Sequence, residues 1–339
     1  LGTLAGTVAA MWLLATTDRG SRWAIVLVLG LVSLEFAWHS GRMLRTIPPS
    51  AAGRENPLIE FLRPRVGSGR VLVGQALLSD REAWWSRIPK LQGYEPVPSA
   101  RLALYAAALT GPQNSDRILL GFESPRLSRL QKPLADALGV RYAVVPGKDL
   151  PDVPGWRRVG GGSLPQEFTL RGKSPSVSHF TIYQNDNPAP RAFLIGRVQL
   201  RDRSSDIVRQ LARLDPRREV LLDRDVLPPG PRQSFTAAEM VEDGSERIQI
   251  QATLTAPGYL VLSDAYYPGW SAWVDDRPAP LLPANLAFRA VPLDRGRHRI
   301  EFRYEPPRWK TGALLSALTV VALLIGLRLG RWGQVNLPG

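Results

Sequence analysis

A run of alternating apolar and polar residues near the C-terminal end most restricts how this chain can fold. The alternation has a period of two over residues 247–254 and again over 299–304, which is typical of strands with one buried and one wet face. In the last strand it predicts Phe302 in the core, with Glu301 and Arg303 facing water. Three more apolar, β-prone runs, each bounded by Pro, Gly or Asp, are 259–262, 270–274 and 286–291. Five short strands at hairpin spacing predict a small antiparallel β-sandwich.

Three long apolar runs have about the length of a membrane-spanning helix. They cover residues 1–17, 23–38 and 311–327. The one acidic residue within them, Glu35, lies near the end of its run, where it could meet the membrane interface or face a polar cavity. We therefore expect two transmembrane helices in 1–41, a C-terminal one in 310–331, and folded domains between them.

The segment before the predicted sandwich has the alternating short helices and strands of a small α/β layer. Helices are expected at 57–62, 100–109, 134–138 and 205–214, and strands at 71–73, 141–145, 179–183, 193–198 and 219–222. Asn56 and Pro57 form a helix-start signal, and Gly160–Gly162 indicates a turn. The expected fold class is α+β: transmembrane helices flanking a small α/β layer (42–230) and a C-terminal antiparallel β-sandwich (231–309).

The amino-acid composition restricts which partners and cofactors the chain can bind. The chain has no Cys, which excludes disulfides and thiolate metal sites. Its net charge of +13 comes from 43 scattered basic residues, five of them Lys, so we expect anionic membrane lipid rather than nucleic acid as a partner. The three His residues, at 39, 179 and 298, show no ligand spacing. We expect no metal and no cofactor.

The sequence of the predicted sandwich resembles the C-terminal signature of the YfhO-like bacterial membrane proteins. The residues that carry the resemblance are LSDAYYPGWSAWVD at 262–275, FRAV at 288–291, GRH at 296–298 and EFRYEP at 301–306. Weaker similarity lies at 93–96, 138–145 and 190–193, so the resemblance covers roughly residues 55–330. Where the family has Asp-Gly after the Trp strand, this chain has Asp275 and Asp276, and we expect a longer turn or one of another type.

The resemblance implies a polytopic protein similar to the GT-C glycosyltransferases, which use polyprenyl-phosphate sugars as donors. It also implies the bacterial inner membrane, a large domain outside the cytoplasm, and an envelope glycan or glycolipid as acceptor. The chain begins at Leu1 inside an apolar run, so we expect a C-terminal fragment, with the family's catalytic acid upstream of it. Whether the fragment itself is an enzyme stays open, because a non-catalytic carbohydrate-binding or assembly module would carry the same residues.

An aromatic group is the candidate substrate-binding site, because aromatic faces stack on sugar rings. Its members are Tyr266, Tyr267, Trp270 and Trp273, with Arg289 and Asp264 available to bond hydroxyls or a phosphate. The alternative is core packing, since strand periodicity sends Trp270 and Trp273 to opposite faces.

An acidic pair also matches a known metal-binding pattern. Asp223 and Asp225 form a D-x-D, which many glycosyltransferases use to hold a metal and a sugar phosphate, but a solvated turn explains it more simply. We assign no catalytic residue.

Overall fold

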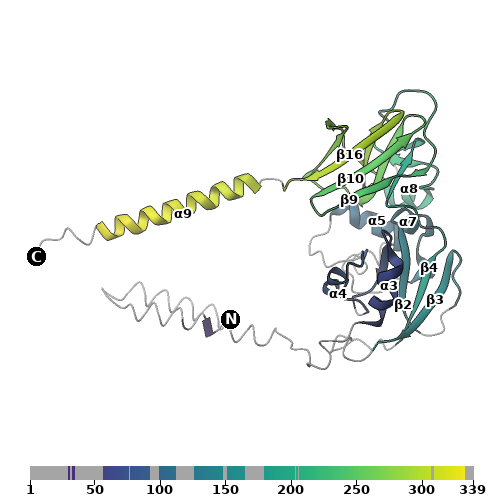
Figure 1. Cartoon of the computed structure of the whole chain (residues 1–339), viewed down its shortest axis with the longest axis horizontal. Helices are drawn as coiled ribbons and strands as arrows, with labels where there is room; N and C mark the ends of the chain where they lie inside the picture. The colour runs from purple at the N-terminus through teal and green to yellow at the C-terminus, as the bar shows by residue number, and fades with distance from the viewer. Residues whose placement is uncertain are drawn as a thin grey trace, which may run out of the picture. The chain divides into compact units, whose positions relative to one another are not determined.

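The computed structural model (Figure 1) describes residues 56–75, 77–91, 99–111, 126–147, 151–164, 179–202, 204, 206–306 and 309–332, with Gly30, Ser33 and Leu34. The chain divides into two compact units, Leu1–Glu55 and Asn56–Gly339. The predicted crossing at 1–17, and most of that at 23–38 with Glu35, lie outside the described residues.

The helices are α3 (Pro57–Val66), α4 (Asp80–Trp85), α5 (Ala100–Thr110), the 3₁₀ turn η2 (Leu127–Arg129), α7 (Lys132–Ala137), α8 (Ile207–Arg213) and α9 (Trp309–Trp332). The strands before residue 230 are β1 (Arg70–Val73), β2 (Val140–Pro146), β3 (Trp156–Ser163), β4 (His179–Asn185), β5 (Ala192–Ile195), β6 (Val198–Leu200) and β7 (Val220–Leu222). After it come β8 (Thr236–Ala237), β9 (Glu239–Asp243), β10 (Arg247–Leu254), β11 (Gly258–Ala265), β12 (Trp270–Val274), β13 (Arg277–Ala279), β14 (Leu282–Ala284), β15 (Phe288–Leu293) and β16 (Gly296–Tyr304).

Two of the three sheets form the sandwich. The five-stranded sheet has the order β13-β12-β16-β10-β9, and the seven-stranded sheet has the order β6-β7-β14-β15-β11-β5-β8. Their facing side chains, among them Leu260, Ile300 and Phe302, make one buried core. Strands β5, β6 and β7 come from the predicted α/β region, so that region and the predicted sandwich share one sheet.

The seven-stranded sheet is covered on both faces. From β11, Leu260 and Leu262 face the sandwich core, whereas Tyr259 and Val261 pack with α5, α7 and α8 in a second core. All four are fully buried, which explains why this strand reads as a continuous apolar run rather than an alternating one. Figure 1 shows α5 and α7 between the sandwich and the strands β2, β3 and β4.

The four-stranded sheet has the order β1-β2-β4-β3 and contains three of the strands predicted for the α/β layer, those at 71–73, 141–145 and 179–183. A third core packs α3 against it, with Leu58 and Leu62 contacting residues such as Val71 and Val144. Asn56 caps α3 as expected, because its side chain accepts a hydrogen bond from Leu58 N at 3.0 Å.

The three glycines Gly160–Gly162 do not form a turn. They lie inside β3 and pair with β4, Gly161 opposite Thr181. A Cβ atom at Gly161 would lie 2.7 Å from the carbonyl oxygen of Phe180. The glycines therefore allow a close backbone approach within a strand, a use of glycine that composition alone does not separate from a turn.

The connection after β12 is tighter than the sequence predicts. Asp275 and Asp276 alone join β12 to β13, with φ angles of 48° and 64°, the positive values of a type I′ hairpin turn. Asp275 Oδ1 accepts a hydrogen bond from Arg299 N, and Oδ2 lies 2.8 Å from His298 Nδ1. These contacts from β16 hold Asp275 in the left-handed conformation, so the expectation of a longer turn is wrong.

The predicted C-terminal crossing at 311–327 falls within α9. None of the helices formed by the described residues combines the length and the apolar character needed to span a bilayer. That prediction is therefore not confirmed.

The first prediction tests the assignment of inside and outside along β16. Phe302 is fully buried between the two sheets, so Phe302→Ala should lower the free energy of unfolding by about 3–5 kcal/mol in a urea titration. Arg297 is exposed on the same strand, and Arg297→Ala should change it by less than about 0.5 kcal/mol. Equal effects would contradict the assignment.

Candidate functional site

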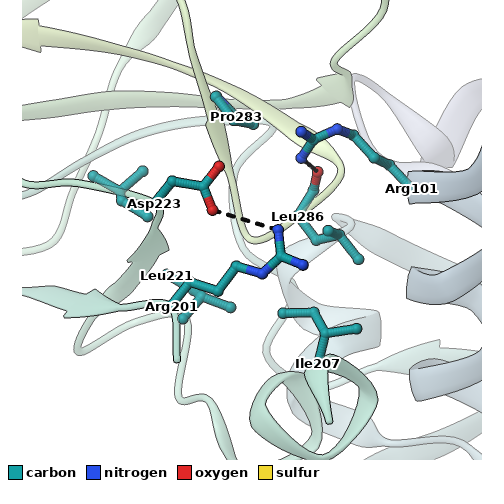
Figure 2. A pocket seen from close by; sticks show the side chains of 8 residues that line it. Arg101, Arg201, Ile207, Leu221, Asp223, Pro283 and Leu286 are labelled. Atoms are coloured by element: carbon teal, nitrogen blue, oxygen red, sulfur yellow. Dashed lines mark hydrogen bonds and ion pairs between the residues drawn. The ribbon is translucent and has the colours of Figure 1, made fainter. Parts of the chain in front are cut away.

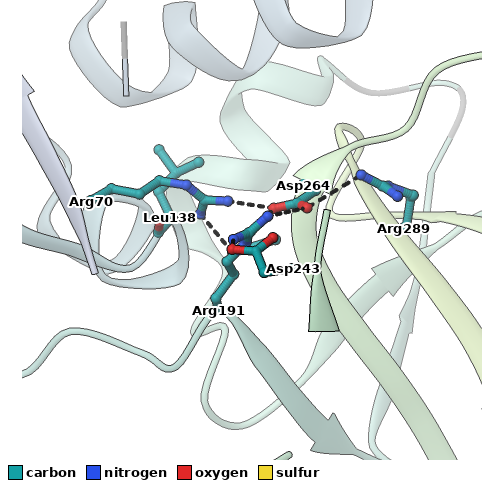
Figure 3. Close-up of polar contacts among 7 residues, drawn as sticks. Arg70, Leu138, Arg191, Asp243, Asp264 and Arg289 are labelled. Carbon is teal, nitrogen blue, oxygen red and sulfur yellow. Dashed lines mark hydrogen bonds and ion pairs between the residues drawn. The ribbon is translucent and has the colours of Figure 1, made fainter. Parts of the chain in front are cut away.

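Three arginines surround Asp264 where the four-stranded and seven-stranded sheets meet (Figure 3). Asp264 Oδ1 lies 2.5 Å from Nη2 of Arg70, and Oδ2 lies 2.8 Å from Nη2 of Arg191 and 3.3 Å from Nη2 of Arg289. Arg70 begins β1, Arg191 precedes β5 and Arg289 lies on β15. We call these four residues the Asp264 cluster. It joins two sheets through one carboxylate.

The backbone places Asp264 at this meeting point through a bulge. Strands β11 and β15 lose register between Leu262 and Ala265, and a bulge re-aims the side chain that it contains. Burial alone would raise the pKa of Asp264, but hydrogen bonds from Arg191 and the charges of Arg70 and Arg289 hold it below its usual value. Asp264 is therefore an ionised carboxylate inside the protein.

The outer contacts of the cluster fix its arginines. Arg70 Nη1 donates to the carbonyl oxygen of Leu138 at 2.6 Å and to Ser263 Oγ at 2.8 Å. Arg191 Nη1 donates to Asp243 Oδ2 at 2.6 Å. Sequence reasoning missed the cluster, although Arg191 and Asp264 both lie in segments that carry the family resemblance.

Trp270 belongs to the sandwich core rather than to an open platform. Its side chain packs against the buried residues between the sheets, with its ring 5.3 Å from that of Tyr304. The Arg289 guanidinium lies 3.8 Å from the Trp270 ring centroid, a cation–π contact. Burial lowers the pKa of Arg289 to about 10, which leaves it charged at neutral pH. Within the described part of the chain, its Nε and Nη1 are buried without a hydrogen-bond partner.

Trp273 lies on the opposite face of the five-stranded sheet and is half-buried. The guanidinium of Arg303 lies 4.6 Å from its ring centroid. Glu301 is opposite Trp273 in the register and accepts hydrogen bonds from Arg303 at 2.5 Å and from Arg247 at 2.9 Å. Glu301 is only 5% exposed, because its neighbours on the adjacent strands cover it. The expectation that Glu301 faces water is therefore wrong. Hydrogen bonds from Arg303 and Arg247 lower the pKa of Glu301 to about 2.

The two tyrosines of the candidate group lie in the connection between β11 and β12. Tyr266 has the guanidinium of Arg101, from α5, at 5.4 Å from its ring centroid, and Tyr267 is 49% exposed. The four aromatic residues and Arg289 therefore lie in three places: the sandwich core, its outer face and this loop. Their binding of a substrate stays a prediction.

Both carboxylates of the D-x-D make contacts within the protein, and Figure 2 shows those of Asp223. Asp223 lies 3.4 Å from Nη1 of Arg201 and lines a cavity of about 10 Å³, which has room for about one water molecule. Asp225 accepts from the Tyr259 hydroxyl at 2.8 Å and from Arg232 at 2.9 Å. This geometry agrees with the interpretation of the pair as a turn.

The histidines that the structure describes make local contacts. His298 bonds Asp275 in the β12–β13 turn, and His179 lies 2.7 Å from Ser163 across β3 and β4. Among the described residues, no three His, Asp or Glu side chains gather as a metal site would require.

Comparison with known proteins identifies the class of protein that this sandwich resembles. Residues 233–316 match the family model of the bacterial membrane protein YfhO, which confirms the resemblance seen in the sequence. That segment contains strands β8 to β16. No curated protein matches the chain.

Two solved structures, both of a mutant arabinofuranosyltransferase AftD from Mycobacteria, were also matched. They share 15% and 16% identity over 49% of this chain, with TM-scores of 0.23 and 0.22. The chain corresponds to 10% of the length of those proteins. Likeness at this level carries no conclusion about fold or function.

The second prediction concerns Asp264. Replacing it by Asn leaves Arg70 and Arg289 without a carboxylate partner and leaves Arg191 with Asp243 alone, so Asp264→Asn should lower the free energy of unfolding by about 3–5 kcal/mol. Asp243 pairs with Arg191 from a side chain that is 55% exposed, and Asp243→Asn should cost less than about 1 kcal/mol. Urea titrations at neutral pH measure both, and a similar cost for the two variants would show that the Asp264 cluster does not hold the sheets together.

The third prediction concerns pH. Because the pKa of Glu301 is about 2 in the folded state against 4.5 ordinarily, its ionised form stabilises the fold above pH 4.5, and this contribution disappears as the pH falls towards 2. The loss of stability caused by Glu301→Gln should therefore be largest near neutral pH and shrink in acid. Glu246→Gln, at an exposed position, is the control. A Glu301→Gln effect that does not change with pH would contradict the assignment.

Proposed function

We propose that the chain is the C-terminal part of a polytopic GT-C-like glycosyltransferase. It acts outside the cytoplasm on cell-envelope glycans or glycolipids, with a polyprenyl-phosphate sugar as donor. The observation that carries the proposal is the match of residues 233–316 to the YfhO family model, over a segment in which both sheets of the sandwich take part. The sequence signature at 262–275 includes Asp264, the carboxylate of the buried cluster. A residue that carries the family resemblance therefore also stabilises the fold.

In this proposal the described domains position a substrate and do not perform the transfer. The acids of the D-x-D are held by Arg201, Arg232 and Tyr259, which favours a structural role for them. The family's catalytic acid belongs to an early extracytoplasmic loop, and we assign it to no residue of this chain. A membrane lipid and a lipid-linked sugar are the partners that the proposal implies.

The alternative function is a non-catalytic carbohydrate-binding or assembly module. Trp273 favours it, because this ring lies on the outer face of the five-stranded sheet, half-exposed. Arg303 covers one face of the indole, so a sugar would stack on the other face. Such a platform needs no catalytic group.

The fourth prediction separates the two functions. Membranes from cells lacking the gene should transfer less labelled sugar from a polyprenyl phosphate to envelope glycans than membranes from cells that carry it. A gene encoding Asp223→Asn should restore transfer, whereas Phe302→Ala, which removes a core side chain, should restore less. Undiminished transfer in the deletion strain would contradict the transferase proposal.

A binding measurement on the purified chain tests the alternative, the non-catalytic module. If the purified chain binds envelope glycans, Trp273→Ala should weaken binding by about 1 kcal/mol, roughly fivefold in Kd, without changing the melting temperature. A lower melting temperature together with the loss of binding would instead assign Trp273 to packing. Glycan binding with undiminished transfer in the deletion strain would favour the non-catalytic module.

A further inference from the structure

A cleft opens beside the Asp264 cluster, between the four-stranded and seven-stranded sheets. Its volume is about 440 Å³, and its walls come from the turn before β1, the start of β2, the segment between β4 and β5, and β8. Three arginines of the described chain line it, Arg70, Arg141 and Arg191. Among the described residues that line the cleft, Asp186 is the one carboxylate, and its side chain is exposed.

The charges around the cleft do not cancel. Within and beside the Asp264 cluster, three guanidiniums face the two carboxylates of Asp264 and Asp243, which leaves an excess of one positive charge. Arg141 adds a second, and Asp186 offsets one of the two. The cleft is therefore net positive, and its low-dielectric walls strengthen the field that an anion meets there.

Arg141 is the arginine whose donors are available to a ligand. The hydrogen bond that the structure gives it among the described residues is a long one, from Nη1 to the carbonyl oxygen of Val66 at 3.3 Å. It lies outside the Asp264 cluster, and the structure pairs it with no carboxylate of the described chain. Its Nε and Nη2 make no hydrogen bond to the described residues, so this cleft-lining residue has donors to spare.

A glycine shapes this part of the cleft. A Cβ atom at Gly69 would lie 2.7 Å from Cβ of Arg141 and 3.2 Å from the carbonyl oxygen of Val66. Real side chains do not approach so closely, so any larger residue would displace Arg141. Gly69 therefore keeps the Arg141 side chain against the turn that enters β1, at the wall of the cleft.

We propose that this cleft binds a phosphate ester. The forked guanidinium of Arg141 donates to the phosphate oxygens, and Arg70 and Arg191, fixed by Asp264, supply the positive field behind them. Guanidinium forks match phosphate geometry and hold their charge at all physiological pH values. A volume of about 440 Å³ exceeds what one phosphate needs, so it also admits the organic group attached to it. The inference does not depend on glycosyl transfer.

The experiment is a calorimetric titration of the purified chain with glucose 1-phosphate, with glucose as the uncharged control. Arg141→Gln should weaken binding about tenfold, and Gly69→Ala, which keeps every charge but displaces Arg141, should weaken it severalfold. Arg277→Gln makes the same change of charge on the exposed strand β13 and should leave the Kd within about twofold.

A second variant distinguishes a direct effect on binding from loss of the folded structure. Asp186 is exposed, so Asp186→Asn should preserve the structure and strengthen binding severalfold by removing the opposing charge. Asp294→Asn, exposed between β15 and β16, is its control and should have no effect. Equal effects of Arg141→Gln and Arg277→Gln, with no gain from Asp186→Asn, would overturn the proposal in favour of general attraction to a basic chain.

Vesicle binding distinguishes the source of the phosphate. Phosphatidylglycerol vesicles are compared with phosphatidylcholine vesicles, again with Arg141→Gln. Binding of glucose 1-phosphate that depends on Arg141 supports a soluble or headgroup-exposed sugar phosphate. Arg141-dependent binding of phosphatidylglycerol vesicles alone supports a lipid headgroup. Binding of neither probe would overturn the proposal.

Discussion

The pairing of one carboxylate with three guanidinium groups holds the two halves of the described fold in register. Asp264 on β11 reaches Arg70 on β1, so a charge on the sandwich is neutralised by a charge on the four-stranded sheet. Removing these ions from water is costly, and the cost is offset only while all the partners keep their positions. The arrangement resists sliding of one sheet against the other. It also prevents the arginines from folding away, and for this reason a positively charged cleft persists beside the contact.

The parts of the fold that follow from local sequence could be predicted, and those that depend on neighbouring strands could not. Strands β10 and β12 have the predicted bounds, because their patterns and boundaries lie within a few residues. The burial of Glu301 follows from its register against Trp273, which the alternation in β16 does not contain. Likewise, Gly160–Gly162 reads as a turn until Phe180 is known to approach from β4.

The candidate site shows the same limit. Strand periodicity correctly separated Trp270 from Trp273, and Trp270 does pack in the core. The Asp264 cluster escaped prediction because its partners are 73 and 194 residues apart in the chain, and no local pattern marks residues that meet across two sheets. Asp264 is part of the sequence signature at 262–275. The signature alone indicates neither the bulge that holds Asp264 nor the arginines that pair with it.

The position of β5 has a consequence for how this region can be divided. Ala192–Ile195 lies between β11 and β8 in the seven-stranded sheet, although it precedes the family-matched segment by nearly forty residues. A shortened chain that began at residue 231 would leave one side of β11 with unpaired backbone N–H and C=O groups and a row of apolar side chains. Such an open strand recruits other chains and promotes aggregation. The matched segment is thus not a self-sufficient unit: in this protein it is completed by a strand that the ribosome makes first.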